Sequence, residues 1–415
     1  MRQRLVFFAI FAAAECAMSA GCSGCGGSGN DDADGSADAD ADTDADTDTD
    51  TDSDTDDNCA DAGDIFDWQP LPEGYDCGPG CHQLTFETVN SVTGWATDGR
   101  YLSCTTEPEP DFKALIIDTE LNCWTEISHP KYSSTLWGYT DISDGNALFG
   151  TLHSGVDSGT STIVLVDIEN TTNCVVQELS NSQTSDANIH FRSVAISGSN
   201  IAYEKNDADH LNMQIELFNL EEQNTSVISD QELTTFHLRM DDDYVVWTDL
   251  TDQTNIEIYA HRISTATTWN LTDHPSDQIT PQMDGTRVVW TDLRNGNGSY
   301  GGSYENADIY MYDFSNDSLT RITDGEWVKY RPDISGDRIV WQDYRACDQP
   351  NNVEDFSQVD IWMHDLATGE DHQVTNLDGS ESQPLIAGGK VIFFKRVPNE
   401  PLFALFSQDL DVLGL

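Results

Sequence analysis

The sequence predicts an all-β protein, a seven-bladed β-propeller of four-stranded antiparallel blades. Segments 287–325 and 338–376 repeat one pattern: a strand ending in W-x-D-x-R, a polar loop, a strand D-I-(Y/W)-M-x-D and a short strand that reaches a threonine. Glycine or aspartate turns recur before each such unit, and they supply turn backbone at low steric cost. A repeat of about fifty residues built only from strands is typical of a propeller blade. Six or eight blades remain open, because the early repeats are degenerate.

Charge and length limit the function classes. The 415 residues contain 74 Asp and Glu against 19 Lys and Arg, a formal net charge of −55. Such a chain repels phosphate backbones and anionic membrane surfaces, so we expect no nucleic-acid partner and no direct membrane binding. The charges are scattered, which favours a solvated acidic surface over a set of cation sites.

Residues 1–21 have the layout of a secretory signal peptide. Arg2 and Arg4 precede the apolar run 5–14, which is too short to span a bilayer. The segment Ala20-Gly21-Cys22 resembles the processing site of bacterial lipoproteins, although Ser19 stands where that family prefers leucine. The resemblance implies lipidation of Cys22 and, because Ser23 follows it, an outer-membrane location on the periplasmic or cell-surface side. A plain secreted protein is the alternative.

Residues 22–58 read as a disordered acidic tether. Segment 31–57 holds 14 aspartates and no basic or large apolar residue. Its charges repel each other and it has nothing to bury, so it stays extended. Its D-x-D spacing lacks the glycine turn and closing glutamate of a calcium loop.

Residues 59–81 form a transition segment that contains cysteines. Cys77 and Cys81 flank Gly78-Pro79-Gly80, a turn that favours a disulfide between them in an exported protein. A bridge between Cys104 and Cys123 is a weaker expectation. No cysteine pattern suits zinc, and whether the chain binds any metal is unknown from the sequence.

Residues 82–415 carry the repeats. Each unit has a turn, a second strand and a third strand. The turns are Thr97-Asp98-Gly99, Asp144-Gly145, Ser197-Gly198, Asp241-Asp242-Asp243, Asp284-Gly285, Ser335-Gly336 and Gly388-Gly389. The third strands are expected at 114–118, 163–167, 215–219, 258–262, 309–313, 361–365 and 405–409. The last unit stops after its third strand, while 82–86 looks like a fourth strand without a unit. We therefore predict that the N-terminal strand closes the last blade, which removes free sheet edges.

These repeats resemble those of TolB-like and WD-repeat-like β-propellers. The resemblance rests on segment 332–341 (PDISGDRIVW) with Asp343 and Arg345, and on Pro281, Gly285, Trp290, Asp292 and Arg294 in the preceding unit. It implies the fold for 82–415 and is sharpest over 241–394. TolB carries a further α/β domain that has no counterpart here, so a role in its complex is not implied.

The repeated charged residues are interpreted as structural. Asp292, Arg294, Asp343 and Arg345 recur at one place in successive units, as an inter-blade salt bridge or a turn cap requires. The aspartates that end third strands, such as Asp313 and Asp365, are expected to cap turns.

A ligand site is predicted where the innermost strands begin. Aligning the units gives one equivalent position that differs from blade to blade, as one asymmetric ligand requires: Thr93, Tyr139, Ser193, His237, Thr280, Arg331 and Gln383. We expect ligand binding by Tyr139, Arg192, His237, Arg239, Gln282, Tyr330, Arg331 and Gln383. His190 lies nearby, and the loops 295–307 and 346–359 are expected to bring Tyr300, Tyr304 and Phe356 to this face. A solvated polar rim without a ligand is the alternative.

The predicted function is non-catalytic recognition of a protein or polysaccharide at the cell envelope, by a lipid-anchored module without a cofactor. The sequence has no H-E-x-x-H or G-x-S-x-G motif, and no catalytic residue is assigned. One alternative is a propeller lyase or hydrolase of saccharides, with His190, His237, Gln282 and Gln383 around the axis. Another is a scaffold in an envelope complex, which predicts an exposed apolar patch on the blades.

Overall fold

The structure is a computed structural model that describes the repeats and the segment just before them. The described residues are 66–72, 77–85, 91–107, 113–127, 135–153, 160–170, 172–180, 191–206, 213–229, 235–250, 255–296, 299, 304–396 and 403–415. The chain divides into two units, Met1–Asn58 and Cys59–Leu415. The predicted signal peptide, Cys22 and the acidic tether lie outside the described residues, so those interpretations stay predictions.

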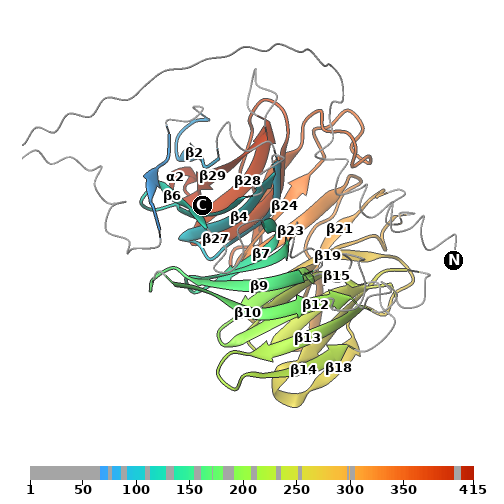
Figure 1. The fold of residues 1–415 in the computed structure, drawn as a ribbon. Helices are drawn as coiled ribbons and strands as arrows, with labels where there is room; N and C mark the ends of the chain where they lie inside the picture. The colour runs from blue at the N-terminus through green and yellow to red at the C-terminus, as the bar shows by residue number, and fades with distance from the viewer. Residues whose placement is uncertain are drawn as a thin grey trace, which may run out of the picture. The chain divides into compact units, whose positions relative to one another are not determined.

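The described strands form seven antiparallel sheets (Figure 1). Six of them have four strands, and the first has a fifth strand at its edge. We number them blades 1 to 7. Blade 1 has β3 (Ser91–Thr97), β4 (Tyr101–Glu107), β5 (Lys113–Asp118) and β6 (Cys123–Ile127); blade 2 has β7 (Thr135–Ser143), β8 (Asn146–His153), β9 (Thr160–Asp167) and β10 (Thr172–Ser180); blade 3 has β11 (Phe191–Ser197), β12 (Asn200–Asn206), β13 (Met213–Asn219) and β14 (Asn224–Ser229).

The remaining blades repeat this arrangement. Blade 4 has β15 (Thr235–Asp241), β16 (Tyr244–Asp249), β17 (Glu257–Arg262) and β18 (Thr267–Asn270); blade 5 has β19 (Gln278–Asp284), β20 (Arg287–Asp292), β21 (Asp308–Asp313) and β22 (Ser318–Arg321). Blade 6 has β23 (Lys329–Ser335), β24 (Arg338–Asp343), β25 (Asp360–Asp365) and β26 (Glu370–Gln373); blade 7 has β27 (Glu381–Ala387), β28 (Lys390–Arg396), β29 (Phe403–Asp409) and, from far upstream, β2 (Cys81–Gln83). The predicted count of seven blades is confirmed.

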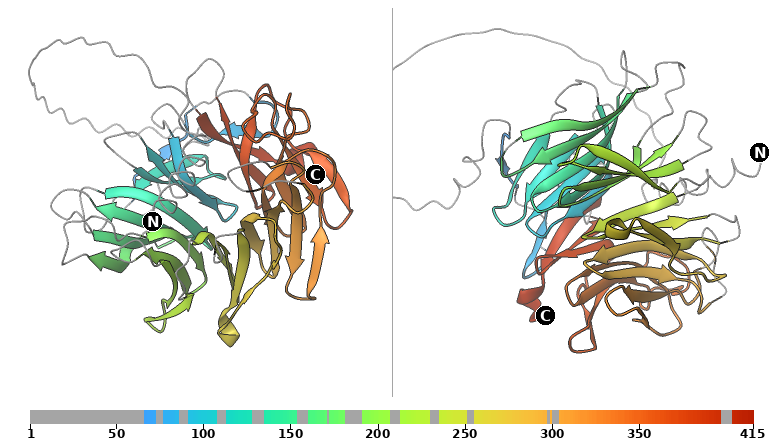
Figure 2. Two further views of the ribbon diagram at one scale, coloured as in Figure 1. Left: turned by 90° about the vertical axis from the view of Figure 1, so that its right-hand side faces the viewer. Right: turned by 90° about the horizontal axis from the view of Figure 1, so that it is seen from below.

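The blades close into a ring around their first strands. Each first strand contacts the first strand of the next blade, and β27 of blade 7 contacts β3 of blade 1 (Figure 2). The first strands therefore line the central channel, and the turns and loops at their two ends form the two faces of the propeller.

Apolar side chains between neighbouring blades hold the ring together. Val246 of blade 4 packs in one cluster with Trp290 and Tyr310 of blade 5, while Ile309 of blade 5 packs with Trp341 of blade 6. Each second strand is buried on both faces, since it lies between two sheets; in β20 and β24 the apolar residues and the tryptophan are buried. Burial of these strands explains why their sequences are continuously apolar.

The N-terminal strand closes the last blade, as predicted. β2 pairs antiparallel with β29, and Figure 1 places both beside the C-terminal helix α2 (Leu410–Leu413). A disulfide joins Cys77 to Cys81 at the start of β2. Gly80 has a φ of +71°, and an added Cβ would lie 2.8 Å from Cβ of Val412, so a larger residue would push α2 away. The closure is therefore a tight junction between the two ends of the propeller.

The propeller begins upstream of the expected boundary at His82. Strand β1 (Gln69–Pro70) pairs with β6 and makes blade 1 five-stranded, and Phe66 packs in a core cluster with Ile116 and Phe149. The weaker disulfide expectation is wrong, because Cys104 is a buried free thiol in the core. Within the described residues, no helix has both the length and the apolar character needed to cross a membrane.

Aspartates tie one blade to the next at the turn end, which we define as the hairpin end where first and second strands join. Asp98 Oδ2 accepts the Gly145 N–H of the next blade at 2.9 Å. Asp241 does the same for Gly285 at 2.6 Å, and Asp284 for Gly336 at 2.7 Å. These recurring aspartates are therefore junction residues.

Candidate ligand-binding mouth

A β-bulge interrupts the inner strand of every blade at the end opposite the turn, which we call the mouth end. The pairing of first and second strands shifts between Val92 and Gly94, Trp137 and Thr140, Phe191 and Val194, Phe236 and Arg239, Ile279 and Gln282, Tyr330 and Asp333, and Ser382 and Leu385. Each shift encloses the residue that the sequence alignment assigns to the mouth: Thr93, Tyr139, Ser193, His237, Thr280, Arg331 and Gln383. A bulge takes its residue out of the ladder and re-aims the side chain. In blades 4 to 7 the mouth residue is the first of two unpaired residues, in blades 2 and 3 it is the second of two, and in blade 1 it is the only one. The four residues of blades 4 to 7 are therefore structurally equivalent.

Four of the mouth residues have a left-handed backbone although none is glycine. The φ angles are 55° at His237, 53° at Thr280, 52° at Arg331 and 54° at Gln383. This conformation costs free energy for side chains with a Cβ, most of all for a β-branched residue such as threonine. The surrounding blades must therefore hold the strand in place. One such contact is the Arg331 N–H, which donates to Thr291 Oγ1 of the preceding blade at 3.1 Å.

The side chains at the mouth differ in exposure and packing. Tyr139 is 46% exposed, whereas Tyr330, also expected at the rim, is only 5% exposed. Tyr330 packs edge-on against Tyr304 at 5.3 Å between ring centres, and the Arg331 guanidinium lies 5.4 Å from its ring. Tyr330 therefore packs against the Arg331 guanidinium and exposes little surface to a ligand.

Some other residues that were expected near the rim are buried or lie outside the described residues. Tyr304 is only 6% exposed and packs against Tyr330, while Phe356 from the next long loop is 40% exposed. His190, Tyr300 and the side chain of Arg192 lie outside the described part of the chain.

In four blades, the residue two positions after the mouth residue is polar. These residues are Asp141 in blade 2, Arg239 in blade 4, Gln282 in blade 5 and Asp333 in blade 6. Arg239 Nε donates to Gln282 Oε1 at 2.5 Å, and its Nη1 donates to the Leu238 carbonyl at 2.8 Å. The two predicted residues Arg239 and Gln282 are thus joined.

Asp141, Arg239 and Asp333 lie at the same register position of the first strand, two residues before its last paired residue, in blades 2, 4 and 6. The first strands line the channel, so the three residues lie at one level around it. Burial raises the pKa of both carboxyls, and the positive charge of Arg239 opposes this. We call Asp141, Arg239, Gln282 and Asp333 the channel cluster.

Burial holds the two carboxyls of the channel cluster partly protonated. It raises the pKa of Asp141 to about 6 and that of Asp333 to about 7, against the opposing effects of Arg239 and of backbone donors. Asp141 Oδ2 accepts the Ile196 N–H of blade 3 at 2.8 Å, and Asp333 Oδ2 accepts the Ile386 N–H of blade 7 at 2.6 Å. Sequence reasoning did not assign these aspartates to the site; their alignment with Arg239 and Gln282 was the available signal.

Comparison with known proteins finds structures of the same fold. No family model matches the chain, and no curated protein matches it. Among solved structures, an oligogalacturonate lyase in complex with manganese aligns with a TM-score of 0.58 at 12% identity, over 84% of this chain and 97% of that one. The β-propeller domain of the Trilobed protease from Pyrococcus furiosus aligns with a TM-score of 0.54 at 13% identity, over 77% and 95%. TolB from Acinetobacter baumannii aligns with a TM-score of 0.41 at 17% identity, over 74% and 78%. The first two likenesses show the propeller fold and nothing further.

The W-x-D-x-R residues are structural, but they act within one blade. Arg345 donates through Nε and Nη2 to both carboxylate oxygens of Asp343, each at 2.7 Å, and Trp341 Nε1 donates to the same carboxylate at 3.0 Å. The Arg345 guanidinium lies 3.6 Å from the centre of the Trp362 ring. The alternative of an inter-blade salt bridge is therefore wrong here, and the turn-cap interpretation is confirmed. Asp313 and Asp365 likewise accept N–H groups of the turns that follow them.

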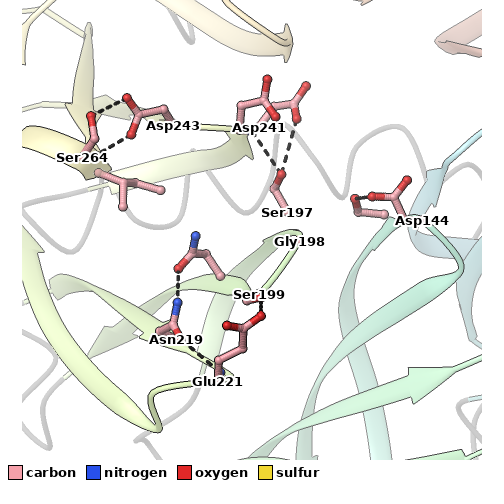
Figure 3. Close-up of a pocket in the computed structure, with 13 residues that line it drawn as sticks. Asp144, Ser197, Gly198, Ser199, Asn219, Glu221, Asp241, Asp243 and Ser264 are labelled. Carbon is pink, nitrogen blue, oxygen red and sulfur yellow. Dashed lines mark hydrogen bonds between the residues drawn. The ribbon is translucent and has the colours of Figure 1, made fainter.

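An open pocket of about 750 Å³ lies on the opposite face, between the turns of blades 2, 3 and 4 (Figure 3). Its carboxylates are already used in local hydrogen bonds. Ser199 Oγ donates to Glu221 at 2.8 Å, and Ser264 Oγ donates to Asp243 at 2.6 Å. Within the described residues, no group of three His, Cys, Asp or Glu is placed to hold a metal ion. The pocket walls are therefore explained by turn and junction contacts.

Proposed function

We propose that the chain is an exported, lipid-anchored propeller that binds a protein or polysaccharide of the cell envelope, without catalysis, through its mouth. One observation carries the proposal: in blades 4 to 7 the inner strand has a bulge at the same place, the first bulge residue has a left-handed backbone although it is not glycine, and that residue changes from blade to blade. Structural positions in this chain repeat their chemistry, as the junction aspartates do. Strained, dissimilar polar residues at one end of the channel are the arrangement that recognition of an asymmetric ligand needs.

The anchor part of the proposal rests on the sequence around Cys22. It is tested by expressing the chain and its Cys22→Ser variant in a bacterium with two membranes that is fed labelled palmitate. We expect label and outer-membrane sedimentation for the wild type only. Equal sedimentation of the variant, or a wild type without label, contradicts the anchor.

The recognition part is tested with purified chain immobilised on a surface. Isolated outer-membrane proteins and isolated surface polysaccharide are passed over it separately. The double variant Arg239→Ala, Arg331→Ala should bind the captured material at least about a hundredfold more weakly, since each loss of a charged hydrogen bond costs about 1.5–3 kcal/mol. Asp365→Asn, at an exposed turn, is the matched control and should bind as the wild type does. Undiminished binding by the double variant contradicts the mouth as the site.

A saccharide lyase is the second candidate, because one structural neighbour is an oligogalacturonate lyase. In that case His237, Gln282 and Gln383 would be the residues available around the axis. Gln282 Oε1 already accepts a hydrogen bond from Arg239, so its use as a metal ligand would require Arg239 to move. Incubation with tetragalacturonate and Mn²⁺, followed by near-ultraviolet absorbance of an unsaturated product, tests this candidate directly.

The scaffold alternative has less support among the described residues. Large exposed apolar side chains are mostly single ones on separate blades, and the one adjacent pair lies on α2: Leu121, Tyr139, Val227, Leu319, Phe356, and the pair Val412 and Leu413. Scattered residues of this kind are normal on a soluble surface. They give no reason to prefer a scaffold.

A further inference from the structure

The junction between blade 7 and blade 1, which we call the seam, differs from the junctions that use an aspartate. Ala387 is the last paired residue of β27, the position that Asp241 and Asp284 hold in blades 4 and 5. Alanine has no side-chain acceptor, so it cannot bind an N–H of the next blade. The Gly99 N–H donates to Thr97 Oγ1 within its own blade, at 3.1 Å. Among the described residues, the seam therefore lacks the aspartate contact of those junctions.

Direct contacts between blades 7 and 1 still cross the seam. Lys390 Nζ donates to the Thr119 carbonyl at 3.1 Å. The ring of Trp95 stacks on that of Phe394, with 5.8 Å between the ring centres. These contacts join the two blades without the N-terminal segment.

Segment 77–85 adds a second connection, on both sides of blade 7. Leu84 packs in one cluster with Leu102 of blade 1 and with residues of blade 7, so it lies at the seam. The two cysteines of the segment pack in another cluster, with Met363 of blade 6 and other residues of blade 7. Both cysteines are buried. One short segment thus contributes to both interfaces of blade 7.

The loop 77–81 also holds the C-terminal end of the chain. The Pro79 carbonyl accepts a hydrogen bond from Gln408 Nε2 at 3.1 Å. The Gly80 carbonyl accepts the Asp409 N–H, which directly precedes α2, at 2.9 Å. The Cys77–Cys81 disulfide joins the two ends of this loop, so it restrains both acceptors.

Reduction of the disulfide removes that restraint. A thiolate of a dithiol reductant attacks one cysteine sulfur, and the second thiol of the reductant then attacks the mixed disulfide and releases that cysteine. Two electrons pass to the protein, which gains two thiols, while the reductant becomes a disulfide. The freed loop contains Gly78 and Gly80, and glycine has the widest choice of backbone conformations. The reduced loop can therefore adopt open forms that the cross-link excludes.

We propose that the Cys77–Cys81 disulfide is a redox latch on the ring closure. In the oxidised chain it holds β2 and α2 on blade 7. Reduction by a dithiol releases both elements, and the seam is then held only by the direct contacts of blades 7 and 1. The latch concerns ring closure and does not depend on a ligand at the mouth.

Hydrogen–deuterium exchange of the purified full chain, followed by mass spectrometry before and after treatment with dithiothreitol, tests the latch. After reduction, amides in 81–85 and 403–415 should exchange roughly tenfold faster or more, because the open forms of the closure gain weight. Amides of β16 and β20 should keep their rates. The double variant Cys77→Ser, Cys81→Ser should exchange at the reduced rate with and without dithiothreitol. Cys347→Ser replaces a buried free thiol and is the matched control, which should respond as the wild type does.

A second variant tests the closure with the disulfide intact. An added Cβ at Gly80 would lie 2.8 Å from Cβ of Val412, so Gly80→Ala should speed exchange in the same two segments without reductant. Three results would overturn the proposal: free thiols at positions 77 and 81 in the untreated wild type, exchange in 81–85 and 403–415 that reduction leaves unchanged, or acceleration that is equal in all seven blades.

Discussion

The two ends of the inner strands follow opposite rules. At the turn end, Asp241 and Asp284 are the last paired residues of the first strands in blades 4 and 5, and Asp98 follows that position by one residue in blade 1. Each of the three accepts the glycine N–H of the next blade. At the mouth end, the aligned bulge residues are a tyrosine, a histidine, a threonine, an arginine and a glutamine in blades 2, 4, 5, 6 and 7. A residue type that repeats at the blade junctions stabilises the ring, because each junction needs the same contact. A residue type that changes from blade to blade at a strained position makes no such repeated contact, and ligand recognition accounts for it.

Asp333 lies between the two ends, two positions beyond Arg331 on β23, and gives the largest expected effect. Burial raises its pKa to about 7, so the unfolded chain ionises first as the pH rises. The free energy of unfolding should therefore fall between about pH 4 and pH 7 and level off above that. Asp333→Asn cannot ionise and still accepts the Ile386 N–H. At pH 8 it should be more stable than the wild type by about 3 kcal/mol, and below pH 4 the difference should vanish.

Urea denaturation at pH 4, 6 and 8 measures this difference. Arg239 and Asp284 also act on Asp333 and remain in place in the variant. The control is Asp365→Asn, because the pKa of Asp365 is lowered by the turn N–H groups of Ala367 and Thr368. It should show no gain at pH 8. Equal behaviour of the two variants would mean that Asp333 is not held protonated in the channel.

The turn end alone is tested by Asp98→Ala. Asp98 accepts the Gly145 N–H at 2.9 Å and, in its own turn, the Tyr101 N–H at 2.8 Å. Loss of these acceptors should destabilise the propeller by about 2 kcal/mol and leave ligand affinity unchanged. Asp98→Asn keeps one acceptor oxygen and should lose about half as much. A variant that keeps its stability and loses binding would reverse the assignment of the two ends.

A matched pair of substitutions gives the smallest effect but the clearest sign. Gly285 at a turn has a φ of 56°, and Gln383 at the mouth has a φ of 54°. Gly285→Ala should destabilise by about 1 kcal/mol, since an added Cβ disfavours this backbone, whereas Gln383→Gly should stabilise by about 1 kcal/mol. Thermal unfolding of both variants decides the point. Two changes of the same sign would contradict strain at the mouth.

Periodic features of the fold could be predicted from the sequence, and contacts across the ring could not. The blade number and the closure by the segment near His82 follow from counting repeated turns and strands. The predicted mouth residues fall within the bulge of each inner strand, because a fixed offset from each turn places them there. Ligand binding by them stays a prediction. Asp141, Arg239 and Asp333 come to one level of the channel only after blades 2, 4 and 6 close into the ring, which no local pattern encodes. Burial of Tyr330 depends on how the loop with Tyr304 packs, and a loop of that length has no periodic signal.

Photocrosslinking in living cells tests the central claim most directly. A photoreactive phenylalanine analogue replaces Tyr139 at the mouth or Asp144 at the turn end, both exposed positions on blade 2. The account predicts covalent adducts with a cell-envelope ligand from position 139 and none from position 144. Adducts from position 144 alone, or equally from both, would contradict a ligand site at the mouth.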